Sequence, residues 1–167
     1  MNGHRPVVNL WRAPLAKETC LVLFLKILYG LMALTSLANG LWMLWNPEGW
    51  YENIPAAVHD TGAFNPHFIR DIGLAYTISG LGFVWAFYNL SRCRMVHIAE
   101  TLFVGGHAGL HVIDIVLGRL PIDHWWIDAP GVLLPGLIMA VLCVPSVWKR
   151  VNPETRPGPG SDREKTG

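Results

Sequence analysis

The chain has 167 residues, of which 51% are apolar and only 15% are charged, with eight tryptophans and a formal net charge of +1. This composition is typical of one small membrane domain rather than a soluble globule, and the absence of a basic run argues against nucleic acid as a partner. Three scattered cysteines without C-x-x-C spacing indicate neither a disulfide framework nor a zinc ribbon. The composition therefore predicts the lipid bilayer as the main partner.

The first predicted membrane span covers residues 20–45 and follows a polar, mildly basic segment, 1–19. The apolar run is too long for a signal peptide and lacks a small-residue cleavage site. Trp45 suits a membrane interface, and Pro47 ends the helix. Residues 46–64 then form a loop that has acids and aromatics but no Lys or Arg.

The second and third predicted spans cover residues 66–89 and 96–118. Asn65 can cap the second helix, and Pro66 suits its first position. A short basic connection, 91–94, separates the two spans. Each segment is long enough to cross the hydrocarbon region, which takes about 20 helical residues.

The fourth predicted span covers residues 130–148, after a loop with tryptophans and acids over 119–129. We expect Pro135 to kink or break its first turn. The tail, 151–167, is rich in proline, glycine and charge, so we expect it to be disordered.

Basic residues concentrate in the amino-terminal segment, the connection between the second and third spans, and the tail. The positive-inside rule then places both termini in the cytoplasm. The predicted fold is an all-α, four-helix transmembrane bundle with its N and C termini cytoplasmic. We expect it in a bacterial inner (plasma) membrane.

The third span carries an ionisable stripe. At about 100° per residue, Glu100, His107, His111 and Asp114 fall within an arc of roughly 60°, with His97 just outside it. Each ionisable group inside a bilayer costs about 2.5–3.5 kcal/mol on insertion scales, so such groups usually have a partner or a task. The stripe is therefore the best functional lead in the sequence. On the opposite face, Gly105 and Gly109 have the spacing that allows another helix to approach closely.

The stripe is expected to open toward the outer side of the membrane. The predicted topology places its carboxyl-terminal half in the same leaflet as the beginning of the second helix, which carries His67, Arg70 and Asp71. Acidic and histidine residues of the two outer loops can cover this region. These loop residues are His59, Asp60, Asp123, His124 and Asp128.

A metal site is the first interpretation of the stripe. His107 and His111 are i, i+4 on one helical face, and Asp114 one turn later adds a carboxylate. Asp71 or His67 is the expected ligand from a second helix. Imidazole with carboxylate suits copper, zinc or iron. A b-type haem fits less well, because two histidines of one helix cannot face each other across it. Such a site can bind a metal or redox cofactor and serve membrane oxidoreductase chemistry.

Two other interpretations stay open. Glu100 and His97 extend the stripe toward the cytoplasm, as in a proton or small-solute pathway, although about 10 Å separates Glu100 from His107 along the axis. Alternatively the polar groups only hold helices together, with Arg70 neutralising a carboxylate. The protein is then an accessory or assembly subunit, with a membrane protein or a second copy of itself as partner. The pattern fits both an enzyme and a non-catalytic protein.

The layout also has a resemblance. Four spans in a short chain, both termini inside, and a glycine-rich second helix entered through Asn65-Pro66-His67-Phe68-Ile69-Arg70-Asp71-Ile72-Gly73 resemble small DoxX-like bacterial membrane proteins. The resemblance implies a four-helix fold and, for some members, quinone-linked or thiol-linked oxidation. It covers the layout of the spans and transfers no catalytic residues.

Overall fold

The computed structural model describes the backbone of residues 12–152 and the side chains of residues 20–152. The regular elements of this part of the chain are all helical. Predictions for residues 1–11 and for the tail from 153 onward lie outside it. The elements are α1 (Arg12–Trp45), α2 (Pro47–Asn53), η1 (Val58–Thr61), α3 (Pro66–Tyr88), α4 (Arg94–Val116), α5 (His124–Ile127), the π-helical turn η2 (Ala129–Leu133), α6 (Leu134–Cys143) and α7 (Pro145–Val151).

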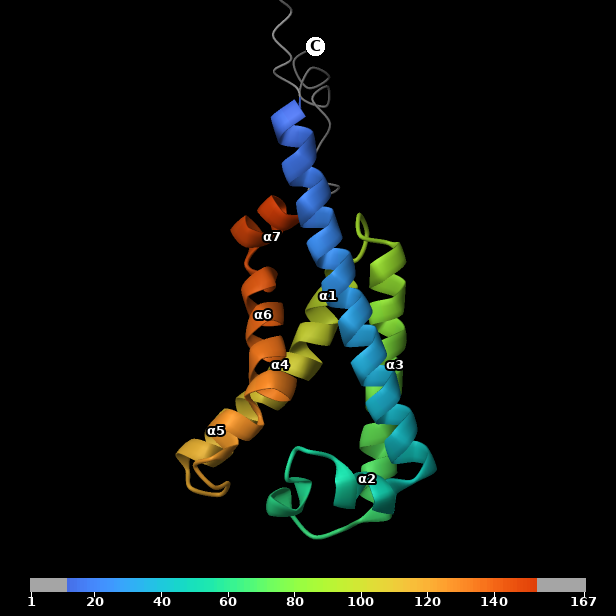
Figure 1. Cartoon of the computed structure of the whole chain (residues 1–167), viewed down its shortest axis with the longest axis vertical. Coiled ribbons are helices and arrows are strands. Elements are labelled where there is room, and N and C mark those ends of the chain that lie inside the picture. Colours follow the sequence, from blue (N-terminus) through green and yellow to red (C-terminus); the bar gives the residue numbers. More distant parts are fainter. Residues whose placement is uncertain (1–11, 153–167) are drawn as a thin grey trace, which may run out of the picture.

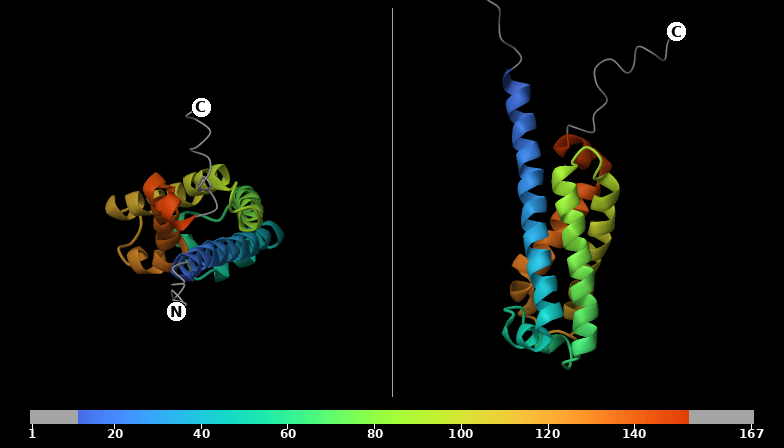
Figure 2. Two further views of the ribbon diagram at one scale, coloured as in Figure 1. Left: turned by 90° about the horizontal axis from the view of Figure 1, so that it is seen from above. Right: turned by 90° about the vertical axis from the view of Figure 1, so that its right-hand side faces the viewer.

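The four long helices form two packed pairs. Helix α1 packs mainly on α3, α4 packs mainly on α6, and contacts between α3 and α4 join the pairs (Figures 1 and 2). The elements α2, η1 and α5 lie at one end of the bundle, here named the α5 end. The α3–α4 connection and α7 lie at the opposite end, here named the α7 end. In Figure 1, α4 and α3 diverge toward the α5 end.

Capping side chains explain where two helices begin. The Asn46 side chain accepts a hydrogen bond from the Gly49 N–H at 2.9 Å and starts α2, within a segment expected to be a loop. The Asn65 side chain likewise accepts from the Phe68 N–H at 3.1 Å, with Pro66 in the first turn of α3. Such caps satisfy backbone donors that have no partner inside the helix.

The expected fourth span differs from the prediction. The helix breaks at Val144, and α7 is bent by 94° from the segment Ala129–Cys143. Pro145 causes the break, because it lacks an N–H and its ring pushes the preceding residue out of the helical region; Val144 has φ −62° and ψ 122°. The π-helical turn precedes α6, and Pro135 lies within the first turn of α6 without breaking it.

One helical segment of the described chain meets the length and hydropathy criteria for a membrane span. Cys20–Trp45 is long and apolar enough to cross a bilayer, and the bent pair formed by Ala129–Cys143 and α7 meets the same criteria if counted as one span. The all-helical fold is thus confirmed. The four-span arrangement is taken up below as part of a proposal.

Glycines allow the first helix pair to approach closely. A Cβ added at Gly40 would lie 2.7 Å from the Gly73 carbonyl oxygen, so α1 and α3 are in backbone contact there. The expected glycine seam of α4 is present only in part. A Cβ at Gly105 would lie 3.7 Å from the Gly136 carbonyl of α6, whereas Gly109 faces open space.

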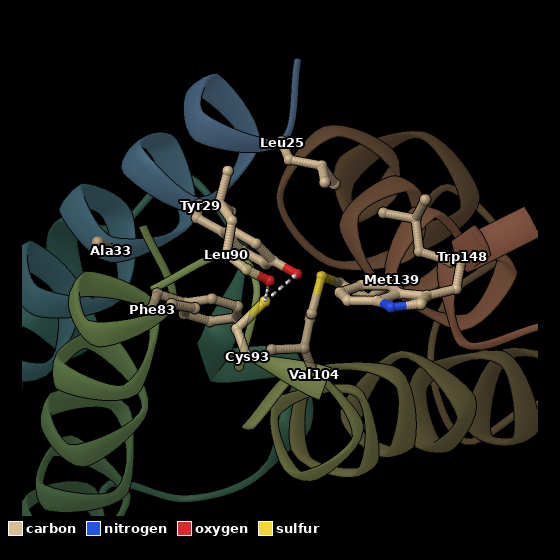
Figure 3. Close-up of a cluster of buried hydrophobic side chains, with 11 residues drawn as sticks. Leu25, Tyr29, Ala33, Phe83, Leu90, Cys93, Val104, Met139 and Trp148 are labelled. Atoms are coloured by element: carbon tan, nitrogen blue, oxygen red, sulfur yellow. Dashed lines mark hydrogen bonds between the residues drawn. The ribbon is translucent and has the colours of Figure 1, made fainter. Parts of the chain in front are cut away.

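The larger hydrophobic core lies at the α7 end. Tyr29, Phe83 and Met139 are fully buried there, and Trp148 of α7 lies beside Met139 in the same cluster (Figure 3). A smaller cluster joins Met43 of α1, Trp50 of α2 and Ile69 of α3. The α5 end therefore contains the smaller of the two clusters, and these three residues also line a cavity.

Candidate functional site

A buried carboxylate between two histidines marks the α5 end. Asp128, which follows α5, is 1% exposed, and its Oδ2 accepts from His111 Nδ1 at 2.7 Å and from His124 Nδ1 at 3.0 Å. His111 lies in the last turns of α4, and His124 begins α5, four residues before Asp128. The short α5 helix thus turns two side chains toward the end of α4.

His124 is completely buried and contacts a second carboxylate. Its Nε2 lies 3.3 Å from Oδ2 of Asp60 in η1. Carboxylate oxygens only accept hydrogen bonds, so both ring nitrogens carry protons when both bonds form. Burial lowers the pKa of His124, but the hydrogen bonds and negative charges of Asp128 and Asp60 outweigh it and raise the pKa above its usual 6.5.

The second oxygen of Asp128 is unusual. Asp128 Oδ1 is buried and has no hydrogen-bond partner in the described part of the chain. A buried polar atom without a partner costs about 1–3 kcal/mol, and more when the group is charged. His111, His124 and Asp128 each offer a ligand atom, and these atoms lie within 4.8 Å of one another. Two imidazoles and one carboxylate are donors that suit zinc, iron and copper, so the group can hold such an ion.

A cavity of about 410 Å³ adjoins this group. His107 and His111 line it from α4, together with aromatic side chains of α2, α3 and α4. The described residues that line it include no Lys, Arg, Asp or Glu. The volume lies within the range of about 300–1,000 Å³ that is typical of small-molecule sites.

The structure brings together two of the five predicted metal ligands. The rings of His107 and His111 are 4.6 Å apart between centroids. Asp114 instead contacts Arg119 at 3.1 Å, and the exposed side chains of His67 and Asp71 contact each other at 3.5 Å. These three predicted ligands, and His107 as well, lie outside the group of His111, His124 and Asp128, so His111 is the one predicted ligand within it.

The predicted supporting residues separate from the site. Arg70 is exposed. His97 and Glu100 are buried toward the α7 end, where His97 contacts Tyr29 and Glu100 accepts a hydrogen bond from the Ser79 hydroxyl. The ionisable residues of α4 therefore lie in two different environments, the packed core at the α7 end and the cavity at the α5 end.

His124 and Asp128 were expected only to cover the site. Their spacing of four residues is a signal that could have identified them, because it places two donors on one face of a helical turn. Their segment reads as an interfacial loop because of the adjacent tryptophans, and nothing local indicates that it folds inward.

Comparison with known proteins finds no family model, curated protein or solved structure that matches the chain. The resemblance to DoxX-like proteins stays a prediction.

Proposed function

We propose that the chain is a small integral membrane protein that holds a divalent transition-metal ion between His111, His124 and Asp128. The observation that carries this proposal is the buried Asp128 carboxylate, which faces two imidazoles and has one oxygen without a partner. A buried carboxylate needs a compensating cation. A metal ion supplies that charge and uses the same donors.

The exposed faces of the helices support a membrane location. Large apolar side chains project outward from each long helix; Leu34 is 66%, Ile78 61%, Leu102 75% and Leu137 61% exposed. Contiguous apolar surface of this kind is costly in water. Helices α3 and α4 have 23 residues each, or about 34 Å at 1.5 Å per residue, which matches the hydrocarbon thickness. We place the α7 end in the cytoplasm and the α5 end on the outer side, following the basic residues.

The residues of the site have distinct roles in this proposal. Nδ1 of His111, Nδ1 of His124 and a carboxylate oxygen of Asp128 would be the metal donors, and Asp60 would orient His124 by accepting from its Nε2. Three protein donors leave room for a further ligand, as in catalytic sites. A bound metal would supply Lewis-acid or redox chemistry beside the cavity. The arrangement suits a metal-dependent reaction of a lipophilic substrate.

A structural role is the second candidate, and one observation favours it. His124 has a carboxylate at each ring nitrogen, so a proton alone can complete this part of the network. The same contacts tie α4, α5 and η1 together. An accessory subunit of a membrane complex would need nothing more.

Metal content separates the two candidates. Detergent-purified protein, measured by elemental mass spectrometry after equilibration with Zn²⁺, Fe²⁺ or Cu²⁺, should hold about one ion per chain. The double variant His111→Asn, His124→Asn should lose it. The matched control His67→Asn, Asp114→Asn alters a histidine and an aspartate outside the group and should retain it. Equal metal in both variants, or none in the unaltered protein, would contradict the proposal.

A further inference from the structure

We propose that the cavity at the α5 end binds a neutral lipophilic phenol, with its hydroxyl group directed to His107 and His111. The inference deepens the proposed function by naming a ligand class for the space beside the metal site, and it rests on that function only where His111 is shared. The cavity walls, their unused hydrogen-bonding groups and their lack of charge carry the argument.

The walls of the cavity suit a flat ring. Trp50, Tyr51, Phe68, Tyr76 and Phe103 line it, from three different helices. Tyr76 and Phe103 are packed edge to face, with ring centroids 5.2 Å apart and an interplanar angle of 75°. Aromatic rings prefer offset or edge-to-face neighbours, so such walls favour an aromatic guest over a linear chain.

Unused polar groups define where a hydroxyl would bind. His107 lines the cavity and has no hydrogen-bond partner in the described part of the chain, and its ring only packs against Tyr76 and His111. His111 uses Nδ1 on Asp128, which leaves Nε2 for a ligand. The Tyr76 hydroxyl is likewise without a hydrogen bond to the described residues. Neutral imidazole has one donor and one acceptor. A hydroxyl group can accept a hydrogen bond from the first or donate one to the second.

The absence of charge in the lining excludes other lipophilic classes. Phosphate headgroups and fatty-acid carboxylates need Lys, Arg or several backbone donors, and no basic side chain lines this cavity. Cationic amphiphiles find no carboxylate in the lining. A neutral hydroxyl compound remains, and the aromatic walls favour a phenol.

A matched pair of probes tests the proposal. Isothermal titration calorimetry of the detergent-solubilised full chain would compare 4-hexylphenol with 4-hexylanisole, which has the same ring and chain but cannot donate a hydrogen bond. The phenol should bind about tenfold more tightly, the factor that one hydrogen bond of about 1.4 kcal/mol gives. Equal affinities would overturn the proposal. Partition into detergent or apolar surface favours the less polar anisole, so it cannot produce a preference for the phenol.

Three variants locate the binding. His107→Phe keeps a ring of similar size and should remove the preference for the phenol, while His67→Phe makes the same change at an exposed position and should leave the preference intact. Ala56→Phe adds volume to the lining and should abolish binding of both probes. If His107→Phe destabilises the protein, Tyr76→Phe removes only a hydroxyl and should still weaken the preference. A preference unchanged in both His107→Phe and Tyr76→Phe would place the phenol elsewhere and refute the assignment.

Failure of this proposal is distinguishable from failure of the metal site. Metal content is measured on the same preparations, and His107→Phe should leave it unchanged. Protein that holds metal but does not prefer the phenol retains the metal site and loses the ligand assignment. Protein that prefers the phenol without holding metal would retain the ligand assignment and contradict the metal site.

Discussion

The two ends of α4 carry the same kinds of side chain in opposite surroundings. At the α7 end, His97 is fully buried, and its Nδ1 lies 3.0 Å from the Tyr29 hydroxyl. Its ring packs on Trp148, with 4.8 Å between centroids. At the α5 end, His107 and His111 border a cavity. Nε2 of His97 also has no hydrogen-bond partner in the described part of the chain, but the ring is fully buried, whereas His107 and His111 are open to the cavity. A histidine in an apolar helix thus becomes a candidate for chemistry where a cavity reaches it.

Side-chain contacts hold the elements of the α7 end together. Arg94 lies over the Trp148 ring at 4.9 Å and donates hydrogen bonds to the Leu142 and Cys143 carbonyls where α6 ends. The Asn152 side chain donates to the Leu90 carbonyl at 2.7 Å. These contacts tie α7 and the α3–α4 connection together. At the α5 end, hydrogen bonds of the Asp128 carboxylate connect α4 with α5 instead. A carboxylate can bind a proton or a metal ion, so this connection depends on the solution conditions.

The largest expected effect is on metal affinity. Asp128→Asn keeps the size of the side chain but removes its charge, so bound metal should fall by more than about a hundredfold in affinity, since even residues that only orient a ligand contribute 10–100-fold. Competition with a metal indicator measures it. Glu100→Gln makes the equivalent change in α4 toward the α7 end and should leave the affinity unaltered. A comparable loss there would show that the two ends act as one site.

The second expected effect is a difference in the free energy of unfolding between variants of His97 and His107. His97→Ala removes a buried ring, its contact with Tyr29 and its packing on Trp148, and should lower the free energy of unfolding by about 2–4 kcal/mol. His107→Ala should cost less than about 1 kcal/mol, because the ring borders a cavity. Denaturant unfolding in detergent, followed by circular dichroism, measures both. Similar losses would mean that the α5 end is packed as tightly as the α7 end.

A smaller effect is expected from a single hydroxyl in the core. Tyr29→Phe removes the contact with His97 Nδ1 and leaves the buried ring in place, so it should cost about 1 kcal/mol. The same unfolding measurement applies. Tyr51→Phe is the matched control, since the Tyr51 hydroxyl donates to the Gly62 carbonyl at an exposed position. A larger loss in the control would reverse the ranking of the two ends.

The helices were predictable because their signals are local. Asn65 with Pro66 specified the beginning of α3, and the long apolar run specified α1 up to Trp45. The signal for the break at Pro145 is equally local, but the prediction places the disruption at Pro135, which a helix tolerates in its first turn. The site was predicted in part. His111 followed from its helical face, whereas His124 and Asp128 depend on how a loop folds back over the bundle, which no periodicity encodes.

The smallest effect is a pH dependence that distinguishes a proton from a metal at the α5 end. The pKa of His124 is raised in the folded chain, so its pairing with Asp128 and Asp60 stabilises metal-free protein fully below the unfolded pKa of about 6.5. This stabilisation is lost as the pH rises through the higher folded value. The melting temperature should therefore fall across that window, by less than about 4 °C, the shift that 1 kcal/mol gives a domain of this size.

Asp60→Asn removes one of the two charges, so the difference in melting temperature between this variant and the unaltered chain should shrink as the pH rises. Metal-loaded protein should respond in the opposite direction, because a metal displaces the imidazole protons and binds more tightly at higher pH. A difference between the two chains that is independent of pH would show that His124 does not titrate in this window. The sign of the pH dependence thus reports which cation the buried carboxylate holds.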